Sequence, residues 1–552
     1  MRLPKTILAL LLSVAALGSS VLPGRKTTGE IPPPGISFSH GSGVYAQKEL
    51  TVTLRAPRGC TVAFTTDGTF PTKEDDSGLS AVEVKLEKGT ARHIARNAEL
   101  QFMKDFSNPP LNDDPTLPNG AMLCAAPVDA EGTLGETEAE VYFLNVDLRT
   151  RYPGFLVLSV VTDPVNLLDY DTGIFAAGAI YDAWRETEEG KKVIEAQEWY
   201  FAETNSSQRG RAWERPCVIQ LYDGADKPTL EQSAGIRIQG DMSRRGNQKS
   251  LNFYFRNAYG SDRLRYDLFP EITEVKSFTL RCGGNTAGMM PYKDAMLQEL
   301  AAGRAVTTAQ SRPAVLFLNG EYWGAYLLTE KLSDKMLHDH YGVKKDQVVV
   351  IKKGEVEVGE EADLRLYQEL MAFADQDLSD PQAYGRFCSV MDVQSFADFC
   401  AVRVYIGDAD WSKTKNIALW RTRDDSYNGG RWNFILYDLE YSSALYMQEE
   451  TAFDTDHIRR AMDKVPLFAA AMRSDEFREL FVKSLKEVGE GNYPYAKVAR
   501  AIQNYNALWS PLLDDNFKRF GGTLQEYRGV VWCTKYFFQQ RYDHILSYAG
   551  AL

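Results

Sequence analysis

The chain has 552 residues, 44% of them hydrophobic and 25% charged, so it is long enough for two or three globular domains and is neither collagenous nor disordered. Its formal net charge of −13 and its lack of a basic block make it a poor candidate for non-specific nucleic-acid binding. The seven cysteines are scattered without CxxC spacing, which argues against structural zinc. We expect most of them to be buried thiols, with Cys60–Cys124 as the one candidate bridge.

The first 20 residues, 1–20, carry two cations, then an apolar run over 7–17, then small residues. This order is typical of a secretory signal peptide, and the apolar run is too short to span a bilayer. No later segment is apolar enough for a membrane helix. The sequence therefore predicts an exported protein, secreted or associated with the cell surface, with no membrane span.

Residues 30–148 follow a Pro/Gly linker and contain short alternating runs, among them 49–55, 61–65 and 140–146. This pattern predicts a small all-β sandwich, which we expect to have a core of its own. The motifs at 42–45 and 65–72 are similar to those of the small sandwich at the C-terminus of chitobiase-type hexosaminidases. That resemblance implies a spacer, or contact with the cell wall or a polysaccharide.

The remaining segment, 150–552, begins with a buried-strand run at 155–162. Further on, 234–239 and 251–256 alternate as strands around a basic loop, and the cations of that loop are Arg244, Arg245 and Lys249. Such a loop can offer backbone N–H groups and cations to phosphates. It is not a Walker A loop, because five residues separate its two glycines. A solvated basic hairpin is the alternative interpretation.

An amphipathic helix is predicted over 292–304. The runs 314–318 and 326–329 then flank Asn319-Gly320, a pair typical of a type I′ hairpin turn, and the second run ends at Glu330. One more strand is predicted near 347–354. From there the chain is expected to be mainly helical, with helices over 362–376, 393–404, 477–488, 495–508 and 534–548.

Two acidic clusters flank a predicted hairpin between 405 and 445. The strands are 417–421 and 432–437, with the turn at 428–430. A hairpin would bring the second cluster, Asp438 and Glu440, beside the first, which contains Asp408, Asp410 and Asn416.

This combination of side chains suits phosphoryl transfer. One carboxylate can accept the proton of an attacking hydroxyl, while a second carboxylate and an amide oxygen hold the Mg²⁺ that bridges the phosphates. In protein kinases the catalytic Asp and the metal-binding Asn are five residues apart. Asp410 and Asn416 are six apart, and acidic residues at strand ends are common, so the spacing alone does not decide the function.

The chain resembles the CotH family of atypical kinases over about 150–550. The resemblance implies an α+β fold with a two-lobed, protein-kinase-like domain after the sandwich. It also implies ATP, Mg²⁺ or Mn²⁺, and phosphorylation of Ser or Thr in proteins at the cell or spore surface. The motifs that carry it are Trp213–Pro216, Gly235–Gly240 with Lys249-Ser250, Leu318–Tyr326 with Thr329-Glu330, Asp410-Trp411 with Asn416, Trp432 and Tyr437–Glu440.

The resemblance also implies roles for single residues. Asp410 is similar to the catalytic acid and Lys249 to the phosphate-contacting lysine, for which Glu299 is a candidate partner. Asn416 and Asp438 are similar to the metal ligands, and Glu440 stands where the family often has a second Asp. The predicted nucleotide-binding set is Lys249, Arg244, Arg245, Glu330, Asn416 and Asp438; the predicted metal set is Asp438, Asn416 and Glu440.

Two other functions stay open at this point. The longer loop and Glu440 are compatible with a catalytically inactive nucleotide-binding pseudokinase that serves as a surface adaptor. The predicted sandwich is compatible with a glycan-binding or glycan-active surface protein, since paired carboxylates also serve glycosidases. Metal-dependent ATP binding separates the first two functions from the third, and transfer of the γ-phosphate separates an active kinase from a pseudokinase.

Overall fold

The computed structural model describes residues 35–97, 105–106 and 111–552. The predicted signal peptide, 1–20, lies outside the described residues. The chain forms both helices and sheets, as predicted for an α+β protein. None of the helices in the described ranges has the length and apolar character needed to cross a bilayer.

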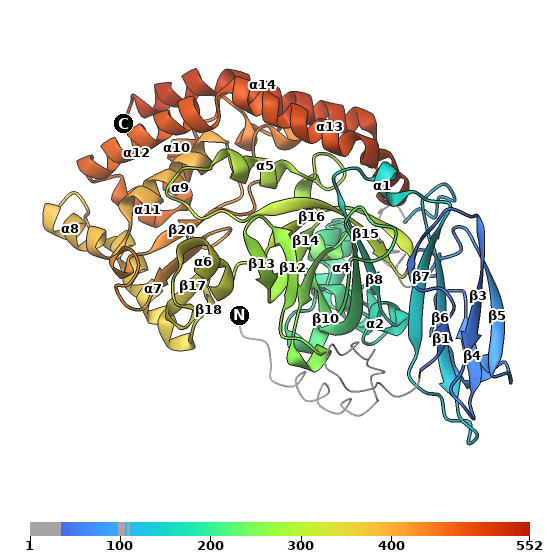
Figure 1. Ribbon diagram of the computed structural model, residues 1–552. Coiled ribbons are helices and arrows are strands. Elements are labelled where there is room, and N and C mark those ends of the chain that lie inside the picture. The colour runs from blue at the N-terminus through green and yellow to red at the C-terminus, as the bar shows by residue number, and fades with distance from the viewer. Residues whose placement is uncertain (1–34, 98–104, 107–110) are drawn as a thin grey trace.

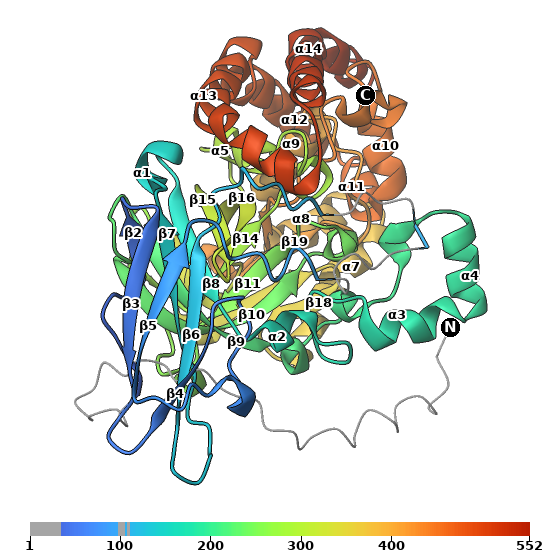
Figure 2. The ribbon, with the colours of Figure 1, turned by 90° about the vertical axis from the view of Figure 1, so that its right-hand side faces the viewer.

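The N-terminal part consists of two stacked sheets, drawn in blue in Figures 1 and 2. The outer sheet has the order β1-β3-β5 and the inner sheet the order β2-β7-β6-β4. Alternate residues of β3, such as Val52 and Leu54, point between the sheets and pack with Leu123 and Leu144. The strands are β1 Ser37–Phe38, β2 Gly43–Tyr45, β3 Glu49–Arg55, β4 Thr61–Thr65, β5 Ala81–Glu87, β6 Ala121–Val128 and β7 Glu138–Leu144.

A closed barrel follows, with the strand order β10-β11-β14-β16-β15-β8-β9. Its interior is filled by aliphatic and aromatic side chains that include Leu158, Ile236, Phe253 and Leu316. The barrel strands are β8 Leu156–Val161, β9 Arg215–Tyr222, β10 Leu230–Gln239, β11 Ser250–Tyr254, β14 Ser277–Arg281, β15 Ser311–Leu318 and β16 Glu321–Glu330; β12 Leu264–Phe269 and β13 Ile272–Val275 form a separate pair.

Both predicted barrel hairpins are confirmed. Strands β10 and β11 pair antiparallel, with Gln239 opposite Ser250, and the basic loop connects them. Strands β15 and β16 also pair antiparallel. Their turn residues Asn319 and Gly320 have φ of 48° and 79°, the two positive values that a type I′ turn requires.

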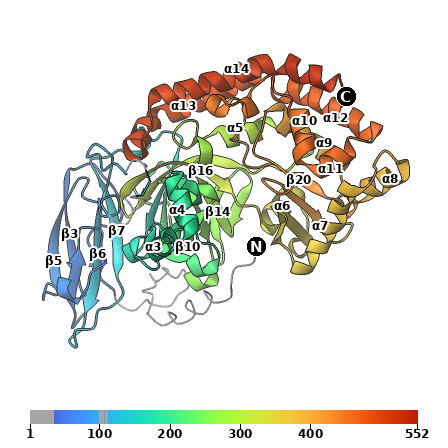
Figure 3. The same ribbon diagram turned by 180° about the vertical axis from the view of Figure 1, so that it is seen from behind.

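The C-terminal part combines a sheet of order β18-β17-β19-β20 with most of the helices. The two longest helices, α13 and α14, run along the top of Figure 1, and Figure 3 shows the small sheet under α9 and α11 from behind. The strands are β17 Val348–Lys352, β18 Glu355–Val358, β19 Ala418–Thr422 and β20 Asn433–Ile435. The helices from α5 on are α5 Lys293–Leu300, α6 Asp334–Tyr341, α7 Leu364–Met371, α8 Pro381–Val390, α9 Val393–Tyr405, α10 His457–Lys464, α11 Pro466–Ala471, α12 Asp475–Glu487, α13 Tyr495–Phe520 and α14 Leu524–Ala549.

Four shorter helices precede them. Helix α1 connects the sandwich to the barrel, and α2, α3 and α4 lie between β8 and β9 in the chain. Their bounds are α1 Leu148–Arg151, α2 Pro164–Leu168, α3 Gly178–Arg185 and α4 Glu188–Glu195.

The sandwich has a core of its own between its two sheets, as expected, and its inner sheet also packs against the rest of the chain. The ring of Phe143 on β7 packs edge-on against Phe317 on β15, with 4.7 Å between the ring centroids. The N–H of Gly120 donates to the carbonyl of Gly320 at 2.8 Å, and the carboxylate of Glu321 accepts from the N–H of Ala95 at 3.0 Å. One continuous apolar cluster therefore includes residues from both parts.

All seven cysteines are free thiols, including Cys60 and Cys124, so the candidate bridge does not form. Four of them, Cys124, Cys217, Cys282 and Cys400, are buried, as expected for small apolar side chains.

Candidate active site

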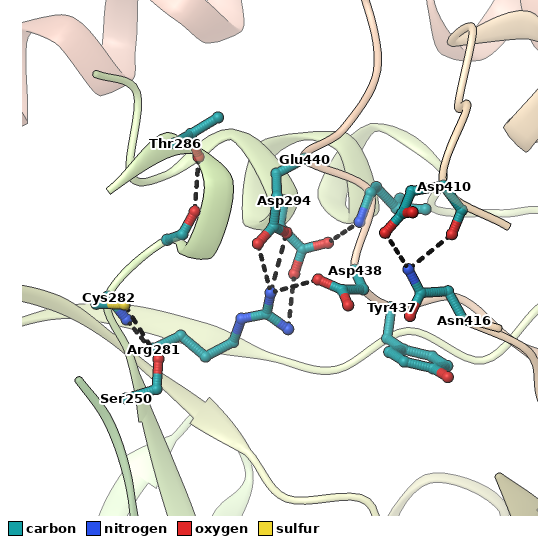
Figure 4. A network of polar contacts seen from close by, with 12 residues as sticks. Ser250, Arg281, Cys282, Thr286, Asp294, Asp410, Asn416, Tyr437, Asp438 and Glu440 are labelled. Carbon is teal, nitrogen blue, oxygen red and sulfur yellow. Dashed lines mark hydrogen bonds and ion pairs between the residues drawn. The ribbon is translucent and has the colours of Figure 1, made fainter. Parts of the chain in front are cut away.

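The predicted acidic hairpin forms. Strand β19 pairs antiparallel with β20, with Leu419 opposite Phe434. The N–H of Ala409 also donates to the carbonyl of Tyr441 at 3.2 Å, which ties the two acidic segments together. Figure 4 shows the result: Asn416 lies between Asp410 and Asp438.

Arg403, in the last turn of α9, stabilises the two acidic segments through contacts with both of them. Its fully buried guanidinium pairs with the carboxylate of Asp408 and donates to the carbonyls of Asn416 and Tyr437, both at 2.8 Å. The other oxygen of Asp408 accepts from the N–H of Asp410 at 2.9 Å. One side chain thus fixes the backbone beside Asp410, Asn416 and Asp438.

Replacing Arg403 with methionine is expected to lower the free energy of unfolding by about 3–5 kcal/mol, the usual cost of leaving a buried charge without its partner. The unpaired charge would be Asp408, whose pKa burial already raises to about 6 against the attraction of Arg403. Urea unfolding monitored by circular dichroism measures the effect.

The double variant with Asp408→Asn is the control, because it removes the unpaired charge but restores none of the contacts to the two carbonyls. We expect it to regain part of the lost stability. An Arg403→Met variant as stable as the unaltered protein would contradict the role given to this residue.

A second cation, Arg281, lies on the opposite side of the acidic hairpin. It ends β14, and its guanidinium is 3.3 Å from Asp438, 2.9 Å from Glu440 and 3.5 Å from Asp294 in the first turn of α5. Asp294 also accepts the N–H of Leu439 at 2.8 Å. Figure 4 shows the three carboxylates converging on this one guanidinium.

The carboxylates around Arg281 differ in exposure and in charge. The side chain of Asp438 is 35% exposed, against 3% for Glu440 and 5% for Asp294. Burial and the neighbouring carboxylates of Asp438 and Asp294 raise the pKa of Glu440 well above its usual range, despite Arg281. Burial also opposes ionisation of Asp438, but Arg281, Lys352 and Lys353 outweigh it and lower its pKa. Asp438 is therefore the ionised, accessible carboxylate of the cluster.

Asn416 and Asp438 both have left-handed backbone conformations, with φ of 54° and 60°. Asn and Asp tolerate this region better than other non-glycine residues, which suits them to these two tight turns. The amide nitrogen of Asn416 donates to the carbonyl of Asp410 at 2.8 Å and to its carboxylate at 3.1 Å. Its amide oxygen is thereby turned toward the Asp438 side in Figure 4.

These two oxygen donors fit a hard cation that a bound phosphate helps to hold. Among the described residues, no group of three or more His, Cys, Asp or Glu side chains is placed to bind a metal by itself. Mg²⁺ in nucleotide sites usually takes one or two carboxylates and completes its shell with phosphate oxygens and water. Asp438 and Asn416 match that donor set, whereas both oxygens of Glu440 face Arg281.

The cations of the basic loop lie apart from this cluster. The ammonium of Lys249 donates to the carbonyls of Arg244 at 2.8 Å and Gly246 at 3.1 Å, and its burial lowers its pKa to about 7. The guanidinium of Arg244 bonds the carbonyls of Gly240 and Gln208, while that of Arg245 pairs with Glu203 at 3.0 Å. All three side chains are buried and stabilise the loop that contains them.

Two further residues were predicted from the sequence to contribute to the site, Glu330 and Glu299. Glu330 is buried at the end of β16, where it accepts from the N–H of Gln310 at 2.8 Å and contacts His340 at 2.9 Å. Glu299 is exposed on α5 and accepts from the hydroxyl of Tyr505 at 2.8 Å, so the guess that it pairs with Lys249 is wrong.

A row of polar side chains crosses the outer face of the barrel next to Arg281. In register across four strands, it consists of Arg237, Asn252, Thr279 and Thr329. The hydroxyl of Thr329 is buried and has no hydrogen-bond partner within the part of the chain that is described. A buried donor without a partner is costly, which marks this face as a place where a polar ligand would gain hydrogen bonds.

The β17–β18 hairpin borders this face. Lys331, directly after β16, pairs with Glu357 on β18 at 3.2 Å, and its ammonium lies 5.9 Å from the ring centroid of Tyr254. Lys353 pairs with Asp241 of the basic loop at 2.8 Å. The polar row thus lies between the barrel and the C-terminal part, next to the cluster of Asp438.

Sequence reasoning missed Arg281, Asp294 and Arg403. A charged residue that ends a strand just before Cys282-Gly283-Gly284 and an acid in the first turn of the next helix were the available signals for the first two. Arg403 gave no local signal, because its partners come from three separate turns.

Comparison with known proteins gives one match. A family model described as CotH kinase protein matches residues 236–545, which is more than half of the chain. A search of curated proteins finds none that matches.

Proposed function

Because the chain belongs to the CotH kinase protein family, we propose that it transfers the γ-phosphate of ATP to hydroxyl side chains of proteins, with Asp410, Asn416 and Asp438 as its chemical centre. The observation that carries the proposal is the convergence of these three residues on one side of the acidic hairpin, with the amide of Asn416 joining Asp410 to the Asp438 side.

Two structural units would then act as the two lobes of a kinase-like domain. The barrel, with its polar row from Arg237 to Thr329, would bind the nucleotide, and the helical C-terminal part would supply the acidic hairpin. The partnerless hydroxyl of Thr329 supports placing the nucleotide on this face. Glu330 lies at the end of the same strand and stays a predicted nucleotide contact.

Arg281 is the better candidate for the cation that faces the phosphates. In protein kinases a strand lysine pairs with a glutamate of the following helix and contacts the phosphates. Here the strand residue is Arg281 and the helix residue is Asp294, 3.5 Å apart. We therefore assign this role to Arg281, and we assign Lys249, Arg244 and Arg245 to support of the loop above the nucleotide.

Asp438 and Asn416 would hold Mg²⁺ or Mn²⁺, which neutralises charge on the phosphates when it is bound. Asp410 would orient the acceptor hydroxyl and take its proton, since the amide of Asn416 fixes one of its oxygens and Lys415 pairs with the other. Glu440 would keep Arg281 in place instead of binding the metal.

The acceptor class and the location are proposed from the resemblance and from the first 20 residues. The acceptors would be Ser or Thr residues of proteins at the cell or spore surface, and the protein itself would be secreted or surface-associated. Contact with the cell wall or a polysaccharide through the N-terminal sheets, and their kinship with the chitobiase-type module, stay predictions.

Replacing Asp410 with alanine is expected to slow phosphate transfer by about 100-fold or more, the usual contribution of a positioned general base. Nucleotide affinity should hardly change, because Asp410 contacts none of the residues of the polar row and Asn416 keeps its hydrogen bond to the backbone carbonyl of residue 410. Calorimetry with a non-hydrolysable ATP analogue and Mg²⁺, together with a labelled-ATP transfer assay, measures both quantities.

Glu449→Ala, which removes an exposed carboxylate on the segment after Glu440, is the matched control and should leave both values unchanged. Full transfer activity of the Asp410→Ala variant would show that Asp410 is not the general base. An unaltered protein that binds ATP and metal but never transfers phosphate would favour the pseudokinase. Failure to bind ATP at all would favour the glycan-binding function.

A further inference from the structure

A largely apolar cavity of about 320 Å³ lies in the C-terminal part, next to the loop that contains Asp410. Three buried rings, Phe396, Phe399 and Phe434, form its floor, where Phe399 and Phe434 stack with centroids 4.4 Å apart. The remaining walls come from α7 and the residues after it, from β19 and from the start of α11; they include Tyr367, Met371, Ala374, Leu419, Val465 and Leu467.

The cavity and the proposed catalytic centre share one loop. Ile417 lines the cavity and directly follows Asn416, and Lys413 lies at the mouth, three residues after Asp410. Phe399 on the cavity floor also supports the other side of the loop, since it packs edge-on against Trp411 at 5.7 Å. The Cα atoms of Asp410 and Lys413, three residues apart, are therefore separated by no more than about 10 Å, which places the Lys413 side of the cavity near Asp410.

Native cores rarely leave a space of this size. Interiors are packed as tightly as organic crystals, and an apolar cavity of about 150 Å³ is already large enough to bind benzene. The cavity here has about twice that volume and is lined mostly by apolar side chains, with Gln368, Asp375 and Lys413 as the polar ones. Pockets of this volume and lining are typical of ligand sites, and this one fits one bulky aromatic or branched aliphatic side chain.

The charge at the mouth narrows the class of ligand. Lys413 is exposed and lines the cavity, and no ion pair involves it within the described ranges. Two further exposed lysines flank Asp410: Lys415 pairs with its carboxylate, and Lys464 donates to the carbonyl of Ala409 at 3.2 Å. The lining also contains one carboxylate, Asp375 after α7, so only the side of the cavity formed by the Lys413 loop is basic. A negative charge on the ligand would therefore be favoured on that side, beside its apolar group.

We propose that this cavity, which nothing in the known reaction of the family requires, binds a bulky apolar side chain of the acceptor polypeptide, next to an acidic residue and about three residues from the phosphorylated hydroxyl. The inference rests on the proposed function, because it takes the occupant to be the acceptor. It names the feature by which acceptors would be selected: an apolar anchor for the cavity and an acid for Lys413.

Peptides with one central serine test the proposal on the full-length protein with ATP and Mg²⁺. A set in which Phe replaces Ala at each position from five before to five after the serine should reveal one favoured position. There kcat/KM should rise by about 10-fold or more, because burial of an aromatic side chain contributes about 1.5–3 kcal/mol. Asp beside that position should add about 2–5-fold over Lys, the scale of an exposed ion pair.

Substitutions in the cavity lining test whether the cavity causes the preference for the Phe peptide. Ala374→Phe fills part of the cavity and should reduce the ratio of kcat/KM between the Phe and Ala peptides to below about 2-fold. Ala501→Phe, at an equally half-buried alanine on α13, is the matched control and should keep the full ratio. Met371→Ala enlarges the cavity and should shift the preference from Phe toward Trp, and Lys413→Glu should reverse the preference between Asp and Lys.

A fluorescence-anisotropy measurement of peptide binding without ATP separates this inference from the proposed function. Phosphorylation of all peptides at equal rates would overturn the inference while the kinase function stands. If no peptide is phosphorylated, the proposed function fails, and equal binding of the Phe and Ala peptides then overturns the inference as well. Binding of free indole by the unaltered protein but not by Ala374→Phe, with no preference among peptides, would assign the cavity to a small molecule and would also overturn it.

Discussion

Replacement of Asp438 by alanine is expected to abolish metal-dependent ATP binding and to reduce phosphate transfer by about 1000-fold or more. Asp438 is the one carboxylate of its cluster that is both ionised and accessible, so no neighbour can take over the metal. A bound metal contributes several kcal/mol to stabilisation of transition-state charge, and about 1.4 kcal/mol corresponds to a factor of ten in rate. Calorimetry with and without Mg²⁺, and single-turnover transfer, measure the two effects.

Asp463→Ala, which removes an exposed carboxylate from α10, is the control for the loss of one negative charge and should behave like the unaltered protein. Glu440→Gln provides the sharper comparison. It keeps the size of the side chain and, in our assignment, removes a partner of Arg281 but no metal ligand, so metal dependence should survive. If Glu440→Gln loses the metal and Asp438→Ala keeps it, the ligand assignment is reversed.

The sequence was a good guide where structure is local. Asn428-Gly429-Gly430 between two apolar runs predicted the pairing of β19 with β20, and Asn319-Gly320 predicted the turn between β15 and β16. Both follow from turn chemistry and from alternation of buried residues along a strand. Because the acidic residues sit at the ends of these strands, the meeting of Asp410, Asn416 and Asp438 was also predictable.

Which cation faces the carboxylates was not predictable from the sequence. Strand alternation places Lys249 on the same side of β11 as Leu251 and Phe253, whose side chains fill the barrel. Asn252 lies on the other side, opposite Thr279 of β14, and Arg281 follows two residues later on that same face. Only the register of three strands shows which cation reaches the carboxylates, and register between distant strands is not contained in a local pattern.

The packing of the N-terminal sheets against the barrel was not predictable for a related reason. The local pattern predicts both Phe143 and Phe317 as buried strand residues. Neither segment predicts that the two rings, 174 residues apart in the chain, pack against each other. The Pro-rich stretch at 29–35 was interpreted as a linker from its composition, but composition does not show whether the module that follows also packs against its neighbour.

The shared core leads to the second large expected effect: a protein shortened to residues 150–552 should not fold to a soluble, cooperative state. Removing the N-terminal sheets would expose Tyr222 and Phe317, and each buried aromatic side chain contributes about 1.5–3 kcal/mol. Two such losses are a large part of the whole stability of a typical domain, about 5–15 kcal/mol. The carboxylate of Glu321 would also lose the N–H groups of Ile94 and Ala95.

Phe143→Ala in the full-length chain tests the same interface without deletion. It should lower the free energy of unfolding by about 3–5 kcal/mol, the range for truncation of a buried Phe. Leu79→Ala, at an exposed leucine in the loop before β5, should have little effect. Soluble yield, near-ultraviolet circular dichroism and urea unfolding of the shortened protein give the direct answer. A single sharp transition for residues 150–552, at the same urea concentration as the full chain, would mean that the N-terminal sheets only cover the barrel; loss of that transition, with the Phe143→Ala effect, would mean that the barrel needs them to complete its own core.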